Sequence, residues 1–260
     1  NGTTNYILTR MDRAGVSFEA ALKEAQDMGY AERNPEADVE GHDTCRKIAI
    51  LTAMATGKEV NYEDIYTEGI TRITDVDFQY AEKLGASVKL FGSSRIDGEQ
   101  VHAWVAPVMI GRDHVLYSVS DVFNGVMVKG NMVGTTMFYG SGAGKLPTAS
   151  AVVADIIAAV RHKNMNIAIG WSEERQTIAP MDTSSYRYFV RVDGNCEENR
   201  SRVEAVFGKA ELTVLDGLDE FAFVTEKMTE AAFKEKAVEF DSACQAFGKK
   251  GILQMIRAEL

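Results

Sequence analysis

The spacing of apolar residues changes near residue 86, and this change most constrains how the chain can fold. Before it, apolar residues recur at the three- to four-residue spacing of helices. After it, they alternate with polar residues in five successive runs, at residues 87–96, 100–110, 114–120, 124–130 and 134–140. Alternation is typical of half-buried strands, and turn residues separate the runs. The pattern predicts a largely antiparallel sheet of hairpin-connected strands, covered by helices.

A second succession of elements begins after residue 184. It consists of a strand, a helix, two strands, a helix and a strand, at residues 186–192, 198–208, 210–215, 220–226, 229–247 and 252–260. This order is that of a ferredoxin-like unit. We therefore expect an α+β chain with a first domain over residues 1–165, a linker over 166–184 and a ferredoxin-like domain over 185–260.

Composition excludes several classes of partner. The chain has 38 acidic and 28 basic residues among 260, a net charge of −10, and no cluster of Lys and Arg, which argues against nucleic acid. No run approaches the length of a membrane span. Cys45, Cys196 and Cys244 form no CxxC pair, which favours a reducing, cytoplasmic environment. Because the chain starts at Asn1 without Met or a signal peptide, we expect a piece of a longer polypeptide.

Residues 29–51, GYAERNPEADVEGHDTCRKIAIL, are dense in charge until an apolar run begins. In a helix over residues 41–56, Asp43 and Lys47 are four positions apart, where a carboxylate meets an ammonium. Ile50 and Met54 continue the same stripe. The rest of this helix is also apolar, so we expect it to be buried, with the Asp43–Lys47 pair at its mouth.

Two interpretations of this pair remain open. It is either an ordinary exposed ion pair, or a lysine in a desolvated cleft that Asp43 orients and that exchanges a proton with a substrate. Glu32, Asp38 and Glu40 would add acceptors for the ammonium of an amino acid. Carboxylates also bind metals, but the EF-hand spacing is absent and His42 stands alone, so we predict no metal site.

Residues 140–150, GSGAGKLPTAS, form a glycine-rich loop before an apolar helix at 146–162. The loop is not a Walker A motif, because Leu146 follows Lys145, and it lacks the last glycine of a Rossmann fingerprint. It is either a tight strand–helix connection, or a backbone contact to a nucleotide phosphate or ribose at a helix N-terminus.

Three segments, NGTTNYIL at 1–8, GYAERNPEADVEGHDTCRKIAIL at 29–51 and GSGAGKLPTASAVVADI at 140–156, resemble in order and spacing the signatures of homoserine dehydrogenase. The resemblance covers residues 1–165. Residues 185–260 resemble an ACT domain, which follows the catalytic region in many bacterial members. The family interconverts L-homoserine and L-aspartate 4-semialdehyde with NAD or NADP, in threonine and methionine biosynthesis.

The resemblance implies roles for individual residues. Lys47 matches the acid/base that handles the substrate hydroxyl proton, and Asp43 matches the carboxylate that supports it. Further matches in the substrate pocket are Gly2, Thr3, Tyr30, Glu32 and Asp38, with Glu32 near the amino group. The matches beside the cofactor are Gly142, Ala143, Gly144 and Thr148.

The chain departs from the family pattern in two places. The nucleotide-binding domain, a second active-site lysine and a monovalent-cation loop are expected upstream of Asn1, so the helix at 146–162 would return to a domain absent here. The Asp-x-Pro-Gly turn of ACT units is replaced by residues 193–196, DGNC. We expect a homodimer or homotetramer. The alternative function is a non-catalytic module for amino acid binding and oligomerisation.

Overall fold

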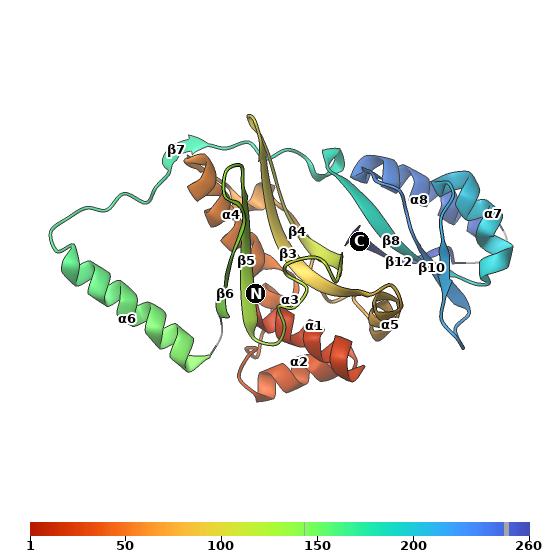
Figure 1. Ribbon diagram of the computed structural model, residues 1–260, viewed down its shortest axis with the longest axis horizontal. Coiled ribbons are helices and arrows are strands. Elements are labelled where there is room, and N and C mark those ends of the chain that lie inside the picture. The colour runs from red at the N-terminus through yellow and green to blue at the C-terminus, as the bar shows by residue number, and fades with distance from the viewer. Residues whose placement is uncertain (143, 247–249) are drawn as a thin grey trace.

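The structure is a computed structural model that describes residues 1–142, 144–246 and 250–260. It is an elongated mixed α/β molecule with a long helix standing away from one end (Figure 1). Its helices are α1 (Gly2–Ala14), α2 (Phe18–Asp27), α3 (Glu36–Val39), α4 (His42–Thr56), α5 (Asp75–Lys83), α6 (Lys145–Arg161), α7 (Cys196–Phe207) and α8 (Glu230–Gln245). Two short 3₁₀ turns lie at Tyr62–Asp64 and Met181–Thr183.

The strands fall into one large sheet and two strand pairs. They are β1 (Lys58–Glu59), β2 (Tyr66–Thr67), β3 (Ala86–Asp97), β4 (Gln100–Gly111), β5 (Phe123–Gly130), β6 (Gly134–Ser141), β7 (Ser172–Arg175), β8 (Ser185–Asp193), β9 (Leu212–Val214), β10 (Glu220–Val224), β11 (Met228–Thr229) and β12 (Ile252–Glu259). The large sheet has the order β2-β4-β12-β8-β10-β9, with β3 beside β4 and β11 beside β8. Strands β1 and β7 pair with each other, as do β5 and β6.

The large sheet is mixed and runs through both halves of the chain. Strand β3 pairs with β4 antiparallel along its whole length, as the alternation predicts. On the other edge of β4, β2 and β12 both pair in parallel. The C-terminal strand thus joins the N-terminal half of the sheet, and residues 185–260 do not build a sheet of their own.

Helices cover both faces of this sheet, because successive side chains of a strand point to opposite faces. Phe189 of β8 packs with residues of α1, α2 and α5, whereas its neighbours Tyr188 and Val190 pack with those of α7 and α8. Helix α4 covers Ala103 and Val105 of β4. The N-terminal helices therefore support the same strands that carry the C-terminal helices on their other face (Figure 1).

One predicted strand is wrong. Residues 114–120 form successive turns, in which the Tyr117 amide donates to the His114 carbonyl at 2.9 Å and the Val119 amide donates to the Leu116 carbonyl at 3.2 Å. A strand following β4 would need the edge of β4 opposite β3. That edge is occupied by β12 at Val108 to Ile110, so no partner remains for the alternating run.

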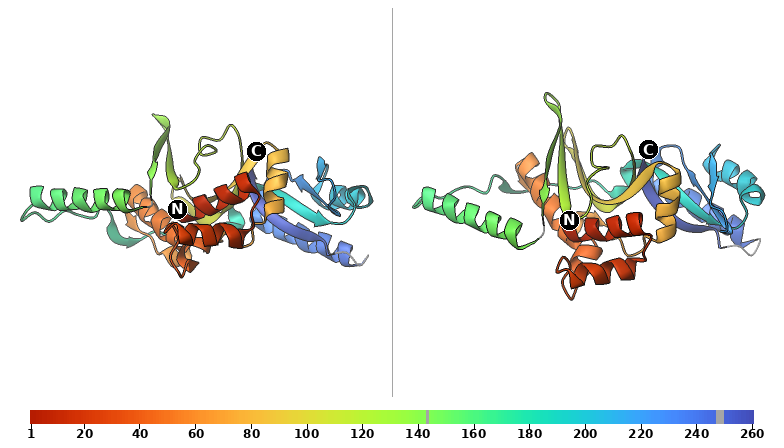
Figure 2. Two further views of the ribbon diagram at one scale, coloured as in Figure 1. Left: turned by 90° about the horizontal axis from the view of Figure 1, so that it is seen from below. Right: turned by 60° about the horizontal axis from the view of Figure 1, so that its bottom comes forward.

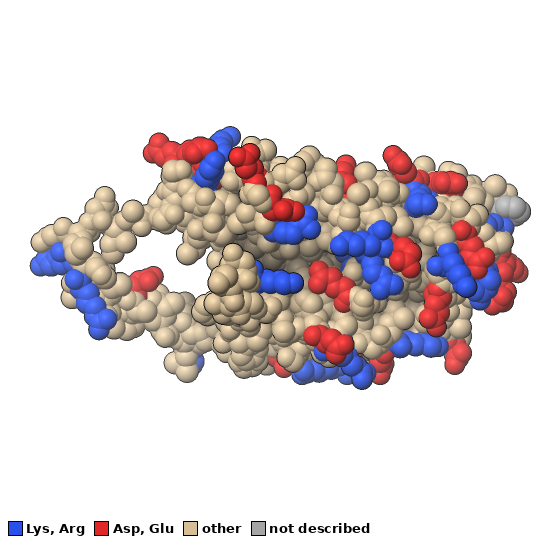
Figure 3. Space-filling model, turned by 45° about the horizontal axis from the view of Figure 1, so that its top comes forward, with Lys and Arg blue, Asp and Glu red and all other residues tan. Residues whose placement is uncertain are grey.

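The hairpin β5–β6 and helix α6 project from the body. The two views of Figure 2 agree that α6 extends away from the sheet and its helices. No residue of α6 is buried, although its sequence is strongly apolar. On the face drawn in Figure 3, charges of both signs are interspersed over the end of the molecule opposite α6, whereas the hairpin is largely uncharged and the projecting part that holds α6 shows a few charged side chains. Among the described residues, no helix has both the length and the apolarity needed to cross a bilayer.

Two buried arginines tie the C-terminal strands to the N-terminal half. Arg191 of β8 donates to Asp77 of α5 at 2.7 Å and forms two bonds of 2.9 Å with Glu220. Arg257 of β12, 1% exposed, donates to Glu68 at 2.9 Å and also binds Glu230. Each guanidinium thus links one carboxylate from each half. Because a buried charge is costly without a partner, both arginines depend on these carboxylates.

Candidate functional site

Three segments bring polar side chains together at the start of α1. The Asn1 amide nitrogen donates to Asp38 Oδ1 at 2.7 Å and to Asp43 Oδ2 at 2.6 Å. Lys47 Nζ donates to the same Asp43 oxygen at 2.6 Å. Asp38, Asn1, Asp43 and Lys47 therefore form one hydrogen-bonded chain, which we call the Asn1 cluster.

Local structure places each member. The Asn1 side chain caps α1 by accepting from the Thr4 amide, which fixes its orientation and leaves its NH₂ group free to donate. Asp38 lies in the single turn of α3. Gly41, at φ +82°, then provides the left-handed residue that turns the chain into α4. Asp43 stands in the first turn of α4, where the helix dipole favours a carboxylate.

The Asn1 cluster is more exposed than the sequence predicts. The Lys47 side chain is 62% exposed and that of Asp43 is 31%. The expectation of a buried α4 is wrong: the helix packs one side on the sheet and leaves Ile50 51% and Met54 61% exposed. Because α4 is apolar nearly all round, its sequence does not reveal which side faces the sheet.

Asp43 is held in its ionised form. Burial opposes its charge, but the hydrogen bonds from Lys47 and Asn1 outweigh burial and lower the pKa of Asp43. An ionised Asp43 keeps Lys47 in place as a hydrogen-bond donor. The resulting lysine is oriented at its ammonium group yet open to solvent on its other sides, a geometry in which it can meet a small polar molecule.

The other predicted substrate residues lie near the Asn1 cluster but do not all join it. Thr3, buried in α1, donates its hydroxyl to the Tyr30 carbonyl at 2.7 Å, which ties the turn after α2 to α1. Gly2 is buried beside Thr3. Glu32 is exposed in the turn after Tyr30, and among the described residues its carboxylate makes no ion pair. An acidic site around Lys47 therefore rests here on Asp38 and Asp43.

The glycine-rich loop lies apart from the sheet, between β6 and α6. The Gly142 amide donates to the Val122 carbonyl at 3.5 Å, and a Cβ on Gly142 would lie 1.8 Å from Asn124 Nδ2. Only glycine therefore fits at position 142 while Asn124 keeps its place, which supports the interpretation of the loop as a tight strand–helix connection. Gly144, at φ +105°, is the N-cap of α6, and Thr148 in the following turn is exposed. Ala143 lies outside the described residues.

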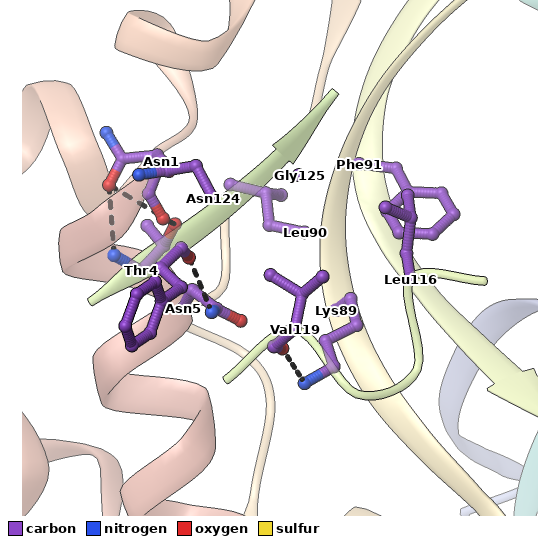
Figure 4. A pocket seen from close by; sticks show the side chains of 11 residues that line it. Asn1, Thr4, Asn5, Lys89, Leu90, Phe91, Leu116, Val119, Asn124 and Gly125 are labelled. Atoms are coloured by element: carbon purple, nitrogen blue, oxygen red, sulfur yellow. Dashed lines mark hydrogen bonds between the residues drawn. The ribbon is translucent and has the colours of Figure 1, made fainter. Parts of the chain in front are cut away.

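A small pocket with a volume of about 60 Å³ adjoins Asn1 and was not predicted (Figure 4). Asn5 on α1 and Asn124 on β5 line one side of it, and Lys89 of β3 lines another. Lys89 is 6% exposed and donates to the Val119 carbonyl at 2.7 Å. Burial lowers the pKa of Lys89 to about 8. The available signal was a lysine inside the alternating run at 87–96.

Comparison with known proteins identifies the family to which these segments point. The sequence profile of the family described as homoserine dehydrogenase matches residues 1–157. The homoserine dehydrogenase of Neisseria gonorrhoeae is 43% identical over an alignment of 205 residues, which covers 76% of this chain and 47% of that protein. That of Bacillus subtilis is 37% identical over an alignment of 250 residues, which covers 90% of this chain and 58% of that protein.

Solved structures agree with the sequence comparison. The crystal structure of a homoserine dehydrogenase from Thiobacillus denitrificans superposes with a TM-score of 0.83 at 32% identity, covering 100% of this chain and 62% of that one. The chain thus spans about half to three-fifths of the length of the relatives it matches. On the profile match and these identities, the chain belongs to the homoserine dehydrogenase family.

Proposed function

We propose that this chain carries the substrate-handling part of a cytoplasmic homoserine dehydrogenase, which interconverts L-homoserine and L-aspartate 4-semialdehyde with NAD or NADP in threonine and methionine biosynthesis. The observation that carries this proposal is the Asn1 cluster, in which Asp43 orients Lys47 inside the region that matches the family. An oriented lysine beside carboxylates suits a substrate that brings both an ammonium group and a hydroxyl proton.

Each side chain has a defined task in this proposal. Lys47, as the neutral amine, takes the proton of the homoserine hydroxyl during oxidation, and as the resulting ammonium it returns that proton during reduction. Asp43 holds Lys47 through the 2.6 Å bond, and Asp38 accepts from the substrate ammonium together with Glu32. The wall behind the substrate is formed by Gly2, Thr3 and Tyr30. The hydrogen bond between Thr3 and Tyr30 fixes the turn that leads to Glu32.

The dinucleotide, when bound, supplies the hydride acceptor. In this chain, one edge of the dinucleotide would contact the backbone of Gly142, Ala143 and Gly144. It would also contact Thr148 in the first turn of α6. These residues fit only part of a dinucleotide. We therefore expect no homoserine-dependent reduction of NADP by residues 1–260 alone. Turnover by the purified 260-residue chain would contradict this expectation.

Substitution of Lys47 tests the proposal in a protein that joins this chain to a dinucleotide-binding region. Lys47→Ala should lower kcat by roughly 10²–10⁴, the usual effect of removing an acid/base. The matched control is Lys23→Ala, because Lys23 also forms an i,i+4 pair with an aspartate, Asp27, on the exposed side of α2. A Lys47→Ala enzyme as active as the Lys23→Ala enzyme would remove Lys47 from this role.

We further propose that residues 185–260 form an ACT-like regulatory unit after a linker at 166–184. The sheet order β12-β8-β10-β9 supports this, since it places the fourth strand beside the first and the third beside the second. The turn at 193–196 is an unfavourable place for a ligand, because Asn195 caps α7 and the Gly194 amide already donates to Asp219. Calorimetric titration with threonine measures whether the unit binds an amino acid elsewhere.

A non-catalytic module for amino acid binding and oligomerisation is the second candidate. The exposed apolar hairpin β5–β6 favours its oligomerisation part. The two candidates differ in one measurement. Threonine binding or self-association without any Lys47-dependent turnover, in a protein that includes a dinucleotide-binding region, would favour the module.

A further inference from the structure

Arg257 reaches from the last strand of the sheet to a short segment that follows β2. Its guanidinium forms two bonds with Glu230 of α8, at 2.7 and 3.1 Å, and one of 2.9 Å with Glu68. Tyr66 stacks under the guanidinium at 5.1 Å and donates its hydroxyl to the same Glu68 oxygen at 3.1 Å. Glu68 is therefore held by two side chains, although its own side chain is 20% exposed.

The residues beside Glu68 are in direct backbone contact with the segment that carries Asp38. The Ile70 amide donates to the Val39 carbonyl at 2.8 Å. A Cβ on Gly69 would lie 2.2 Å from that carbonyl oxygen and 2.5 Å from Glu40 Cα. No side chain fits there without moving the backbone. The segment at 67–70, which we call the Glu68 segment, is thus packed backbone to backbone against residues 39–40.

The Glu68 segment also abuts the start of α4. A Cβ on Gly41 would lie 3.3 Å from the Glu68 carbonyl oxygen and 3.3 Å from Thr67 Cγ2. Gly41 is the left-handed residue between Asp38 and Asp43. The position of the Glu68 segment therefore sets where α3 ends and where α4 begins, and with it the separation of the two carboxylates that Asn1 bridges.

We propose that Glu68 is a positioning residue for the substrate site: its ion pair with Arg257 holds residues 39–41 in place, so that Asp38 and Asp43 stay in register with Asn1. The C-terminal half of the chain thereby contributes to the substrate site without touching it. This inference rests on the proposed function for its kinetic consequence only, because the structural link is present whatever the site binds.

The second arginine link supplies a matched control. Glu220 pairs with Arg191 at 2.9 Å, and its side chain is 12% exposed, close to the value for Glu68. Glu68→Gln and Glu220→Gln therefore remove the same charge from equivalent partners. Of these two glutamates, Glu68 is the one that adjoins the segment at 39–41.

Hydrogen exchange followed by mass spectrometry on the 260-residue chain is the first measurement. Glu68→Gln should speed exchange over residues 36–41 and at Ile70 by roughly tenfold, the effect of weakening one charge-assisted hydrogen bond. Glu220→Gln should leave exchange at these residues unchanged and act on β8 and α5 instead. Equal acceleration at 36–41 by both variants, or by neither, would overturn the proposal.

Kinetics in a protein that includes a dinucleotide-binding region is the second measurement. Glu68→Gln should raise the KM for homoserine several-fold with a smaller change in kcat, since Lys47 keeps its own partner, and Glu220→Gln should change neither. Gly69→Ala, which shifts the backbone at residues 39–40 directly, should reproduce the KM effect with the Glu68–Arg257 pair intact. A normal KM in Gly69→Ala would contradict the positioning role. Absence of activity in every variant, including the unaltered protein, would refute the proposed function while the exchange result still decides the inference.

Discussion

The Asn1 amide gives both of its hydrogens to carboxylates, one on each side of the turn between α3 and α4. Two carboxylates this close would repel each other without a donor between them. The side-chain amide of Asn1 satisfies both and carries no charge of its own. The group that bridges the two carboxylates is thus neutral, while the side chains assigned to substrate and proton are charged.

Lys89 makes stability depend on pH above neutrality. Burial lowers its pKa from 10.5 to about 8, so between these values the unfolded chain holds a proton that the folded chain has released. The free energy of unfolding therefore rises with pH across this window, by up to ~3 kcal/mol at 1.4 kcal/mol per pKa unit. Below pH 8 this contribution is constant.

Comparison with Lys89→Met isolates this effect, because all other titrations are shared. Urea unfolding at pH 7, 8.5 and 10 should show the unaltered protein gaining stability relative to the variant as pH rises. Parallel stability curves for the two proteins would mean that Lys89 does not titrate in this range.

At the level of helices and strands, each of the two buried arginines joins a strand of the C-terminal half to an N-terminal segment. Arg191→Met would leave Asp77, which is fully buried, and Glu220 without their cation. We expect a loss of roughly 3–5 kcal/mol of unfolding free energy, typical of breaking a buried ion pair.

Arg200→Met is the control for this substitution. Its pair with Glu197 is exposed, with side chains 43% and 76% accessible, so it should cost less than about 1 kcal/mol. Denaturant unfolding of both variants measures the difference. Similar losses for the two would show that the buried pair contributes no more than a surface pair.

Sequence patterns predicted these elements to different extents. The strands at β3, β4, β5 and β6 follow the alternation, because each has an antiparallel neighbour next to it in the chain. Residues 114–120 alternate equally well but form turns, since the edge they needed is taken by β12, more than a hundred residues later. Pairing over such a distance leaves no local pattern. The same limit applies to Glu68 and Arg257, whose contact depends on the parallel pairing of β12 with β4.

The candidate site was predictable where it follows helical spacing. Asp43 and Lys47 are four residues apart, and their ion pair forms as the spacing predicts. Their exposure was not predictable, because α4 is apolar on both sides. Asn1 and Lys89 were missed, since the role of each comes from segments distant in sequence.

At the scale of the whole molecule, apolar side chains are exposed mainly on the hairpin β5–β6 and on α6. Met132 is 89% exposed and Phe138 is 69%. A patch of this kind is typical of a surface that another protein covers. We propose self-association into a homodimer or homotetramer through the hairpin.

Phe138→Glu tests this assembly. It should shift sedimentation velocity profiles toward the monomer, because a charge on an apolar interface must be desolvated on association. Val238→Glu on α8, where the side chain is equally exposed at 68%, should leave the profile unchanged. Identical profiles for both variants would exclude the hairpin as the contact.

The pairing of β12 with β4 also governs how the chain acquires its structure during synthesis. About 140 residues separate the end of β4 from the start of β12, which at 5–20 residues per second is a delay on the order of ten seconds. Throughout that interval the edge of β4 at Val108 to Ile110 has unpaired amides and carbonyls, a state that favours association with other nascent chains. A chaperone that shields this edge until β12 emerges would therefore raise the yield of folded protein more than one that acts after β12 has been made.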